Sequence, residues 1–159
     1  MNQQSAEIVA LKMELEINAS PSSVWKALTE NIGAWWPAEF YAGGEEGKRS
    51  YLLEASPGGR MYEQWEGGGG VLWGTVYTCE PEKRLQVLGS RFPNWGGPTQ
   101  WFGTWELQAS GSGTTLSFSE HEMGNVSESG LAEKDHGWRF LWNNLKAHVE
   151  GTPPPAWED

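Results

Sequence analysis

The chain is poor in basic residues and in cysteine. Its 159 residues include 11 Lys and Arg against 21 Asp and Glu, so the formal net charge at pH 7 is -10. Such a surface repels nucleic-acid phosphates, and the basic patch typical of nucleic-acid-binding proteins is lacking, so we expect no nucleic-acid partner. The single cysteine, Cys79, allows no internal disulfide. This is typical of a reducing compartment, and we expect a cytoplasmic protein.

Long hydrophobic runs are also lacking. No stretch approaches the roughly 18 apolar residues that a membrane helix needs, so we expect no membrane insertion. The N-terminal segment has no basic region followed by an apolar run, and we therefore expect no signal peptide. The length predicts a single domain over 1–159, in which 151–159 form an extended tail because Pro153 to Pro155 forbid a helix.

Motifs for metal, nucleotide and nucleophile chemistry are missing as well. The histidines form no His-x-x-x-His pair, and there is no Cys-x-x-Cys pair or Gly-x-Ser-x-Gly motif. The glycines Gly67 to Gly70 precede a strand pattern, whereas a dinucleotide-binding fingerprint opens a helix. We therefore predict no metal and no cofactor, and the sequence identifies no catalytic residue.

Tryptophan is the residue that the chain has in excess, with 11 copies. Trp is large and rigid, and it is enriched where apolar surface meets a polar partner. Two interpretations stay open at this point, an unusually aromatic core and a pocket lined by aromatic rings. Composition alone favours the core.

Hydrophobic periodicity predicts a strand, two short helices and then a run of strands. Apolar and polar residues alternate over 7–17, which is typical of a half-buried strand. Ser20 is a good N-cap and Pro21 suits the first helical position, so a helix is expected over about 21–30. A second short helix should follow and end before Pro37.

The remainder of the chain predicts an antiparallel sheet and one long helix. About six strands joined by short turns lie between 40 and 122, with Gly67 to Gly70 as a hairpin turn. An amphipathic helix is expected from about 128 to 150, ended by Gly151. A curved antiparallel sheet can wrap around such a helix and leave a cavity, so the predicted fold class is α+β.

Two carboxylates are expected on apolar strand faces. Glu120 continues the face of Leu116 and Phe118, and Glu63 shares a face with Met61. Such a carboxylate could orient a ligand or act as an acid or base. The alternative for Glu120, which we favour, is a core arginine partner such as Arg60, or a strand that has bent out to solvent. For Glu63 the partner stays open.

Gly137 lies in the middle of the long predicted helix. Glycine there costs about 1 kcal/mol relative to alanine, so it indicates a close approach. We favour packing against the sheet over room for a ligand.

Five stretches resemble one superfamily, and they occur in its order. They are INASPSSVWKALTE (17–30), PGGRMYEQW (57–65), WGTVYTCEPEKRL (73–85), WELQASGSGTTLSF (105–118) and GWRFLWNNLKAHVE (137–150). The sequence resembles the START-like helix-grip superfamily, also called SRPBCC, and within it the branch named for the activator of the heat-shock-protein ATPase. The resemblance implies six to seven antiparallel strands gripping a long C-terminal helix over a pocket. It implies function only loosely, because relatives include lipid carriers, cyclases, hydrolases and co-chaperones.

The favoured functional interpretation is non-enzymatic binding of a small hydrophobic or aromatic molecule in a Trp-lined cavity. The candidate ligand-binding residues are Trp36, Met61, Glu63, Trp65, Trp101, Trp105, Phe118, Glu120, Trp138 and Trp142. Strand parity does not settle which indoles face inward. For Trp73 it favours the outside, because Leu72, Gly74 and Val76 form the competing row.

Two other function classes stay open. One is a cyclase- or hydrolase-like enzyme acting on an aromatic or polyketide-like substrate, with Glu120, Glu63 or His121 as the acid or base. The other is a protein-interaction module such as a chaperone cofactor, which would expose an apolar patch. A homodimer and a chaperone complex are the protein partners that these interpretations allow.

Overall fold

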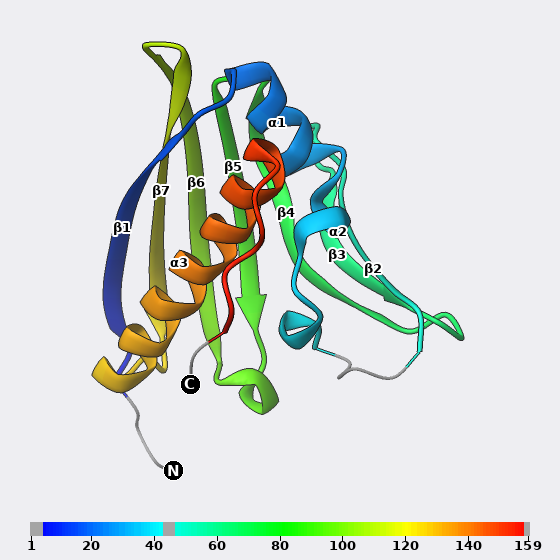
Figure 1. The fold of residues 1–159 in the computed structure, drawn as a ribbon. Coiled ribbons are helices and arrows are strands. Elements are labelled where there is room, and N and C mark those ends of the chain that lie inside the picture. The colour runs from blue at the N-terminus through cyan, green and yellow to red at the C-terminus, as the bar shows by residue number, and fades with distance from the viewer. Residues whose placement is uncertain (1–4, 43–46, 158–159) are drawn as a thin grey trace.

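A computed structural model describes residues 5–42 and 47–157. Within these ranges the chain forms one antiparallel sheet, α-helices and two short 3-10 helices (Figure 1). The elements, in chain order, are β1 (Glu7–Ile17), α1 (Pro21–Thr29), α2 (Ile32–Trp35), η1 (Ala38–Phe40), β2 (Arg49–Leu53), β3 (Arg60–Trp65), β4 (Gly70–Glu80), β5 (Arg84–Arg91), η2 (Pro93–Trp95), β6 (Thr99–Ser110), β7 (Gly113–Gly124) and α3 (Glu128–Glu150).

The sheet has seven strands in the order β1-β7-β6-β5-β4-β3-β2, and every neighbouring pair is antiparallel. The segment with α1 and α2 carries the chain from the β1 edge to the β2 edge. Figure 1 shows the sheet curving around α3, with α1 beside the C-terminal end of that helix. The predicted α+β helix-grip architecture is therefore confirmed.

Ser20 and Gly151 cap helices as predicted, and Ser127 is a further cap that the sequence analysis did not name. The Ser20 side chain accepts a hydrogen bond from the Ser23 N–H, and α1 covers most of the predicted range. The Ser127 side chain caps α3 in the same way by accepting from the Gly130 N–H. Gly151 ends α3 with φ of 69°, a left-handed conformation that favours glycine.

The turn between β3 and β4 has the predicted hairpin character. Gly67 and Gly68 have φ of 88° and 90°, a backbone region that other residues rarely adopt. The Trp65 N–H donates to the Gly69 carbonyl and closes the turn. The glycine run is thus a strand connection, as the sequence predicts.

An aromatic cluster fills one half of the space between the sheet and α3. Trp105, Phe118 and Trp142 are each at most 2% exposed. Their ring centroids lie 4.9 Å (Trp105–Phe118), 5.1 Å (Phe118–Trp142) and 5.8 Å (Trp105–Trp142) apart. We call these three residues the aromatic core. Part of the tryptophan excess therefore serves packing.

The segment after α3 returns along that helix toward η1 (Figure 1). Its Trp157 lies with ring centroids 5.1 Å from Phe40 and 4.9 Å from Phe140. His136 lies on the same indole, 4.6 Å away. The C-terminal segment thus packs on the outer side of α3 and on Phe40 of η1.

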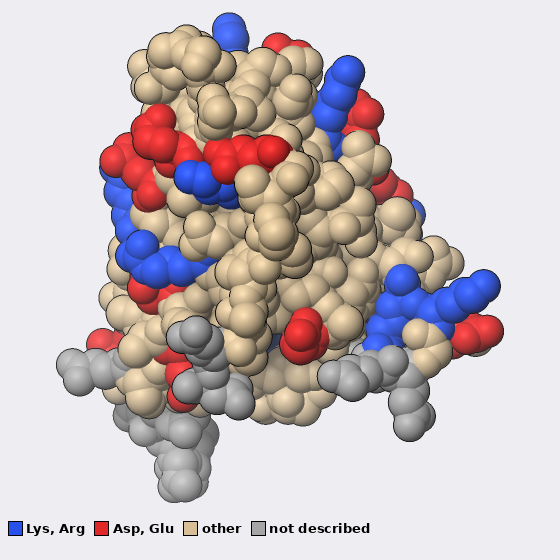
Figure 2. Space-filling view, viewed as in Figure 1, with Lys and Arg blue, Asp and Glu red and all other residues tan. Residues whose placement is uncertain are grey.

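The surface carries charges of both signs close together. On the face drawn in Figure 2, Lys and Arg side chains lie beside Asp and Glu, and no broad basic area is visible. Of the helices in residues 5–42 and 47–157, none is both long and apolar enough to cross a membrane. Within the same residues, no group of three or more His, Cys, Asp and Glu side chains is placed to hold a metal ion.

Candidate functional site

A cavity of about 720 Å³ opens between the sheet and the N-terminal half of α3. Both aromatic rings and charged side chains line it. The aromatic lining consists of Trp36, Phe40, Tyr51, Trp73, Trp95, Trp101 and Trp138. The charged lining consists of Arg91, Glu120, Glu122, Glu133 and Lys134.

Aromatic stacking holds the wall of the cavity that lies toward β2. Trp36, just after α2, stacks on Tyr51 of β2 with ring centroids 3.9 Å apart. Burial raises the pKa of the Tyr51 phenol well above its ordinary value, and the charge of Glu63 and the nearby Tyr41 add to the shift. Tyr51 therefore stays neutral and presents a ring to the cavity.

Three glycines, Gly74, Gly89 and Gly103, let Trp101 lie close to the sheet. Gly89 lies between Gly74 and Trp101 in the strand register, and Gly103 is next but one to Trp101 on β6. A Cβ atom on Gly89 would lie 2.3 Å from Cε2 of Trp101, and one on Gly103 would lie 3.0 Å from its Cζ3. Side chains at these positions would push the indole into the cavity, so the glycines help to keep it open.

Glu63 is a buried carboxylate that orients two indoles. Its oxygens accept the Nε1–H groups of Trp65 and Trp73, both at 2.9 Å, and the backbone N–H of Ala42 at 3.1 Å. Glu63 itself does not line the cavity, but Trp73 does. It therefore fixes one wall residue and ties the segment after η1 to β3.

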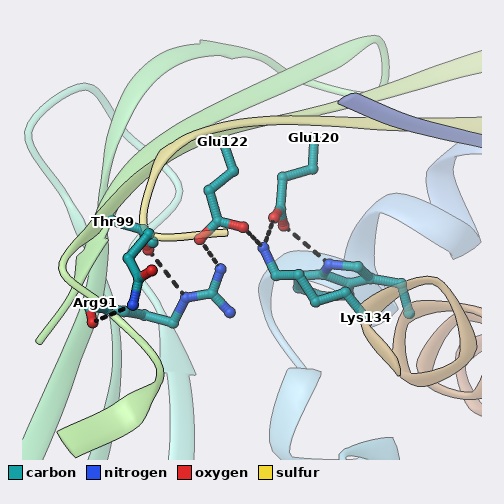
Figure 3. Close-up of polar contacts among 8 residues, drawn as sticks. Arg91, Thr99, Glu120, Glu122 and Lys134 are labelled. Carbon is teal, nitrogen blue, oxygen red and sulfur yellow. Dashed lines mark hydrogen bonds and ion pairs between the residues drawn. The ribbon is translucent and has the colours of Figure 1, made fainter. Parts of the chain in front are cut away.

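Four charged side chains form a continuous chain at the other side of the cavity (Figure 3). Lys134 of α3 donates to Oε1 of Glu120 and to Oε2 of Glu122, and Arg91 of β5 donates to Oε1 of Glu122. The Nε1–H of Trp138 donates to Oε2 of Glu120 at 2.9 Å. We call Arg91, Glu120, Glu122 and Lys134 the ionic quartet. Its two positive and two negative charges balance.

The quartet keeps Glu122 ionised. Burial raises the pKa of this carboxyl, but hydrogen bonds from Lys134 and Thr99 and the charges of Lys134 and Arg91 together outweigh burial. The pKa of Glu122 therefore lies below its ordinary value of 4.5. At neutral pH the side chain is an acceptor and has no proton to give.

The structure brings half of the predicted site residues to the cavity. Those that line it are Trp36, Met61, Trp101, Glu120 and Trp138. Those that do not are Glu63, Trp65, Trp105, Phe118 and Trp142. Glu63 and Trp65 contact each other beside Trp73, and the other three form the aromatic core.

Strand parity misplaced Trp73. Its indole lines the cavity, and Leu72 is 56% exposed, although Leu72 was expected inside and Trp73 outside. The register between β3 and β4 shifts at this point, because Met61 faces Gly74 while Tyr62 faces Leu72. Trp73 is the extra residue of this β-bulge, which redirects its side chain.

The predicted partner and the predicted histidine are also corrected. Glu120 pairs with Lys134, whereas Arg60 pairs with the exposed Glu54. β7 does not bend out to solvent, since Glu120 is buried. His121 is exposed and lies on the opposite face of β7, so it is not near the cavity carboxylates.

Four charged residues of the cavity lining were missed as site residues, and three of them carried a signal. Glu122 has the strand parity of Glu120. Lys134 lies one helical turn before Trp138, on the same face of α3. Arg91 continues the row of Val87 and Gly89 on β5. Which of these residues contact one another could not be predicted from the sequence, because this depends on how α3 lies on the sheet.

Comparison with known proteins places these features in a wider group. The family model described as Activator of Hsp90 ATPase homolog 1-like protein matches residues 18–150. No curated protein matches the chain in sequence.

Several solved structures share the fold. A protein from Rhizobium leguminosarum is 22% identical with a TM-score of 0.68, over 92% of this chain and 97% of that one. CalU16 from Micromonospora echinospora is 20% identical with a TM-score of 0.60, over 92% and 87%. The Aha1 dimer from Colwellia psychrerythraea is 20% identical with a TM-score of 0.60, over 89% and 96%. At this identity the likeness shows the fold alone.

Proposed function

The chain belongs to the Activator of Hsp90 ATPase homolog 1-like family, and from this premise we propose that it binds a small hydrophobic or aromatic molecule between the sheet and α3, without catalysing a reaction. The observation that carries the proposal is the cavity of about 720 Å³ with its aromatic wall. Pockets for small molecules measure roughly 300–1,000 Å³ and are mostly apolar with a few polar groups. This cavity has both properties.

Several residues help to keep the cavity open, which supports a binding role. The three glycines let the Trp101 indole lie close to the sheet, and a hydrogen bond to Glu63 fixes the Trp73 indole. Burying a carboxylate costs free energy unless the group is fully hydrogen-bonded. Here the buried Glu63 positions Trp73 at the cavity and the neighbouring Trp65. Packing alone would be served as well by aliphatic side chains.

The engagement of the carboxylates favours binding over acid–base catalysis. An acid or base must exchange a proton with its substrate. Both oxygens of Glu120 are already occupied by Lys134 and Trp138, and both oxygens of Glu122 by Arg91 and Lys134. A cytoplasmic location and a homodimer remain compatible with this proposal.

Tryptophan fluorescence tests the proposal directly. Titration with naphthalene, indole and a medium-chain fatty alcohol should quench or shift the emission saturably for at least one of these probes. Trp73→Ala removes a wall residue and should weaken that binding about tenfold or more, since a well-packed aromatic contact contributes on the order of 1–2 kcal/mol.

The matched control is Trp25→Ala. Trp25 is a buried indole of α1 that does not line the cavity, so this variant should keep the affinity in its folded fraction. The proposal fails if no probe changes the emission, or if both variants affect binding equally.

A further inference from the structure

The aromatic wall alone leaves the charge of a ligand open. Tryptophan faces pack against flat apolar rings, and they also attract cations by about 0.5–2 kcal/mol. The ionic quartet decides between these ligands, because its atoms face the same cavity. The relevant question is whether it offers acceptors or donors to a molecule that enters.

The acceptors of the quartet are buried and occupied. Glu120 is 3% exposed and Glu122 is 2% exposed. Each of their four oxygens accepts a hydrogen bond from Lys134, Arg91 or Trp138. An ammonium ligand would therefore find these carboxylates shielded, and it would lie beside two positive side chains.

The donors of the quartet are more accessible and not all used. The side chains of Arg91 and Lys134 are 23% and 15% exposed. Lys134 has three N–H bonds, of which two point to Glu120 and Glu122. Arg91 uses Nε for Thr99 and Nη2 for Glu122, and within the described part of the chain Nη1 donates to no residue. Figure 3 shows this terminal nitrogen turned away from Glu122.

The balance of charge does not oppose a ligand with an oxygen acceptor. The quartet is neutral as a unit, so an oxygen acceptor can use the spare N–H groups without competing with a bound carboxylate. Among the described residues, Glu133 is the remaining charged residue of the cavity lining; it is exposed, and water and salt screen its charge. Charge-assisted hydrogen bonds from Arg and Lys to a carboxylate are among the strong ones.

We propose that the cavity selects a flat aromatic molecule that carries an oxygen acceptor, a carboxylate above all, held by Nη1 of Arg91 and the spare N–H of Lys134. This inference rests on the proposed function. It adds the chemical class of the ligand and names Arg91 and Lys134 as the residues that recognise it.

Three probes with one ring system and different charge test the selection. They are 2-naphthoate, 2-methylnaphthalene and 2-naphthylmethylammonium, titrated at pH 7 with tryptophan emission as the readout. The expected order of affinity is naphthoate, then methylnaphthalene, then the ammonium. We expect at least about tenfold between the first and the last, since one charge-assisted hydrogen bond changes an equilibrium by that much.

Arg91→Gln identifies the donor. It should weaken naphthoate binding about tenfold and leave methylnaphthalene binding unchanged. Arg84→Gln is the matched control, because Arg84 is on the same strand but pairs with Glu80 and Glu106 at the exposed surface. If Arg91→Gln does not fold, Arg91→Lys replaces it. The lysine can still pair with Glu122 but has no second nitrogen for the ligand, so the same loss is expected.

The outcomes separate this inference from the proposed function. An ammonium that binds as tightly as naphthoate overturns the acceptor selectivity and leaves hydrophobic binding intact. A naphthoate affinity that is unchanged in Arg91→Gln, or in Arg91→Lys where that variant replaces it, overturns the role of Arg91. If none of the three probes binds while naphthalene, indole or the fatty alcohol does, the selectivity is overturned and the binding function stands; if no probe of either set binds, both fail.

Discussion

The two halves of the concave face share three elements, β6, β7 and α3, and one half is filled whereas the other is open; only the open half also takes residues from β2, β3, β4 and β5. Along β6, β7 and α3 the aromatic core fills one half with contacting rings. Further along the same elements, Trp101, Glu122 and Lys134 border a cavity of about 720 Å³. The backbone architecture is therefore compatible with either state.

The difference lies in what the side chains require. Rings of the aromatic core gain free energy by touching each other, so they close the space. The charged groups of the ionic quartet are satisfied by one another and cannot pack into the apolar wall without losing their hydrogen bonds. The Trp101 indole lies on glycines, and the groups of the ionic quartet are hydrogen-bonded to one another. A cavity is thus left between them.

Truncating one tryptophan in each half should give the largest contrast. Trp105→Ala leaves a void in the aromatic core and should lower the free energy of unfolding by about 3–5 kcal/mol. Trp73→Ala enlarges a space that is already open, and should cost about 1–2 kcal/mol. Urea denaturation followed by circular dichroism measures both. Equal losses would mean that the cavity wall is as tightly packed as the core.

Removing the central cation of the ionic quartet should have the next largest effect. Lys134→Met leaves Glu120 and Glu122 buried without their shared partner, and should cost about 2–3 kcal/mol at pH 7. The pKa of Glu122 is lowered in the folded protein, so its contribution is present above pH 4.5 and is lost as pH falls through the folded pKa. The variant lacks much of that contribution, so the gap to the parent should narrow on acidification.

Lys146→Met is the control for that experiment. Lys146 is on the same helix, and at the surface it lies 3.9 Å from Glu150 and donates to the Glu16 carbonyl at 2.7 Å. Its loss should cost no more than about 1 kcal/mol, with little dependence on pH below 7. A pH-independent cost for Lys134→Met would show that its methylene packing, and not its charge, matters.

The contrast between the halves also explains what the sequence could predict. Period-two and period-3.6 patterns report burial within one element, so the residue ranges of β1, α1 and α3 could be predicted closely. The same patterns placed Glu120 on the apolar face of its strand, because β7 keeps regular parity there. Trp73 could not be found in this way, because a β-bulge changes parity without a clear sequence signal.

Contacts between distant elements were the least predictable part. The ionic quartet joins β5, β7 and α3, and its pairing depends on which turn of the helix lies over which strand. The aromatic core and the cavity wall use the same residue types on the same faces. For that reason Trp105 and Trp142 could not be distinguished from Trp101 and Trp138 by pattern alone.

Glu63→Gln tests how much the wall depends on the carboxylate behind it. A glutamine has one acceptor oxygen, so one of the indole N–H groups of Trp65 and Trp73 loses its partner. We expect a loss of about 1–2 kcal/mol in unfolding free energy and weaker binding of an aromatic probe. Glu106→Gln, on the exposed side of β6, should change stability by less than about 0.5 kcal/mol and leave binding unchanged. Unchanged probe affinity in Glu63→Gln would show that Trp73 holds its position without Glu63.

Gly137→Ala should have the smallest effect on stability, and it distinguishes the two roles considered for this glycine. An added Cβ would lie 3.4 Å from Cε1 of Phe40, a ring that also contacts Phe140 and Trp157. The gain of about 1 kcal/mol in helix propensity should roughly offset the displacement of that ring, so the net change should stay below about 1 kcal/mol. Gly137 also lines the cavity, and the added methyl group should weaken an aromatic probe severalfold. Lower stability with unchanged affinity would assign the glycine to packing, whereas unchanged stability with lower affinity would assign it to ligand space.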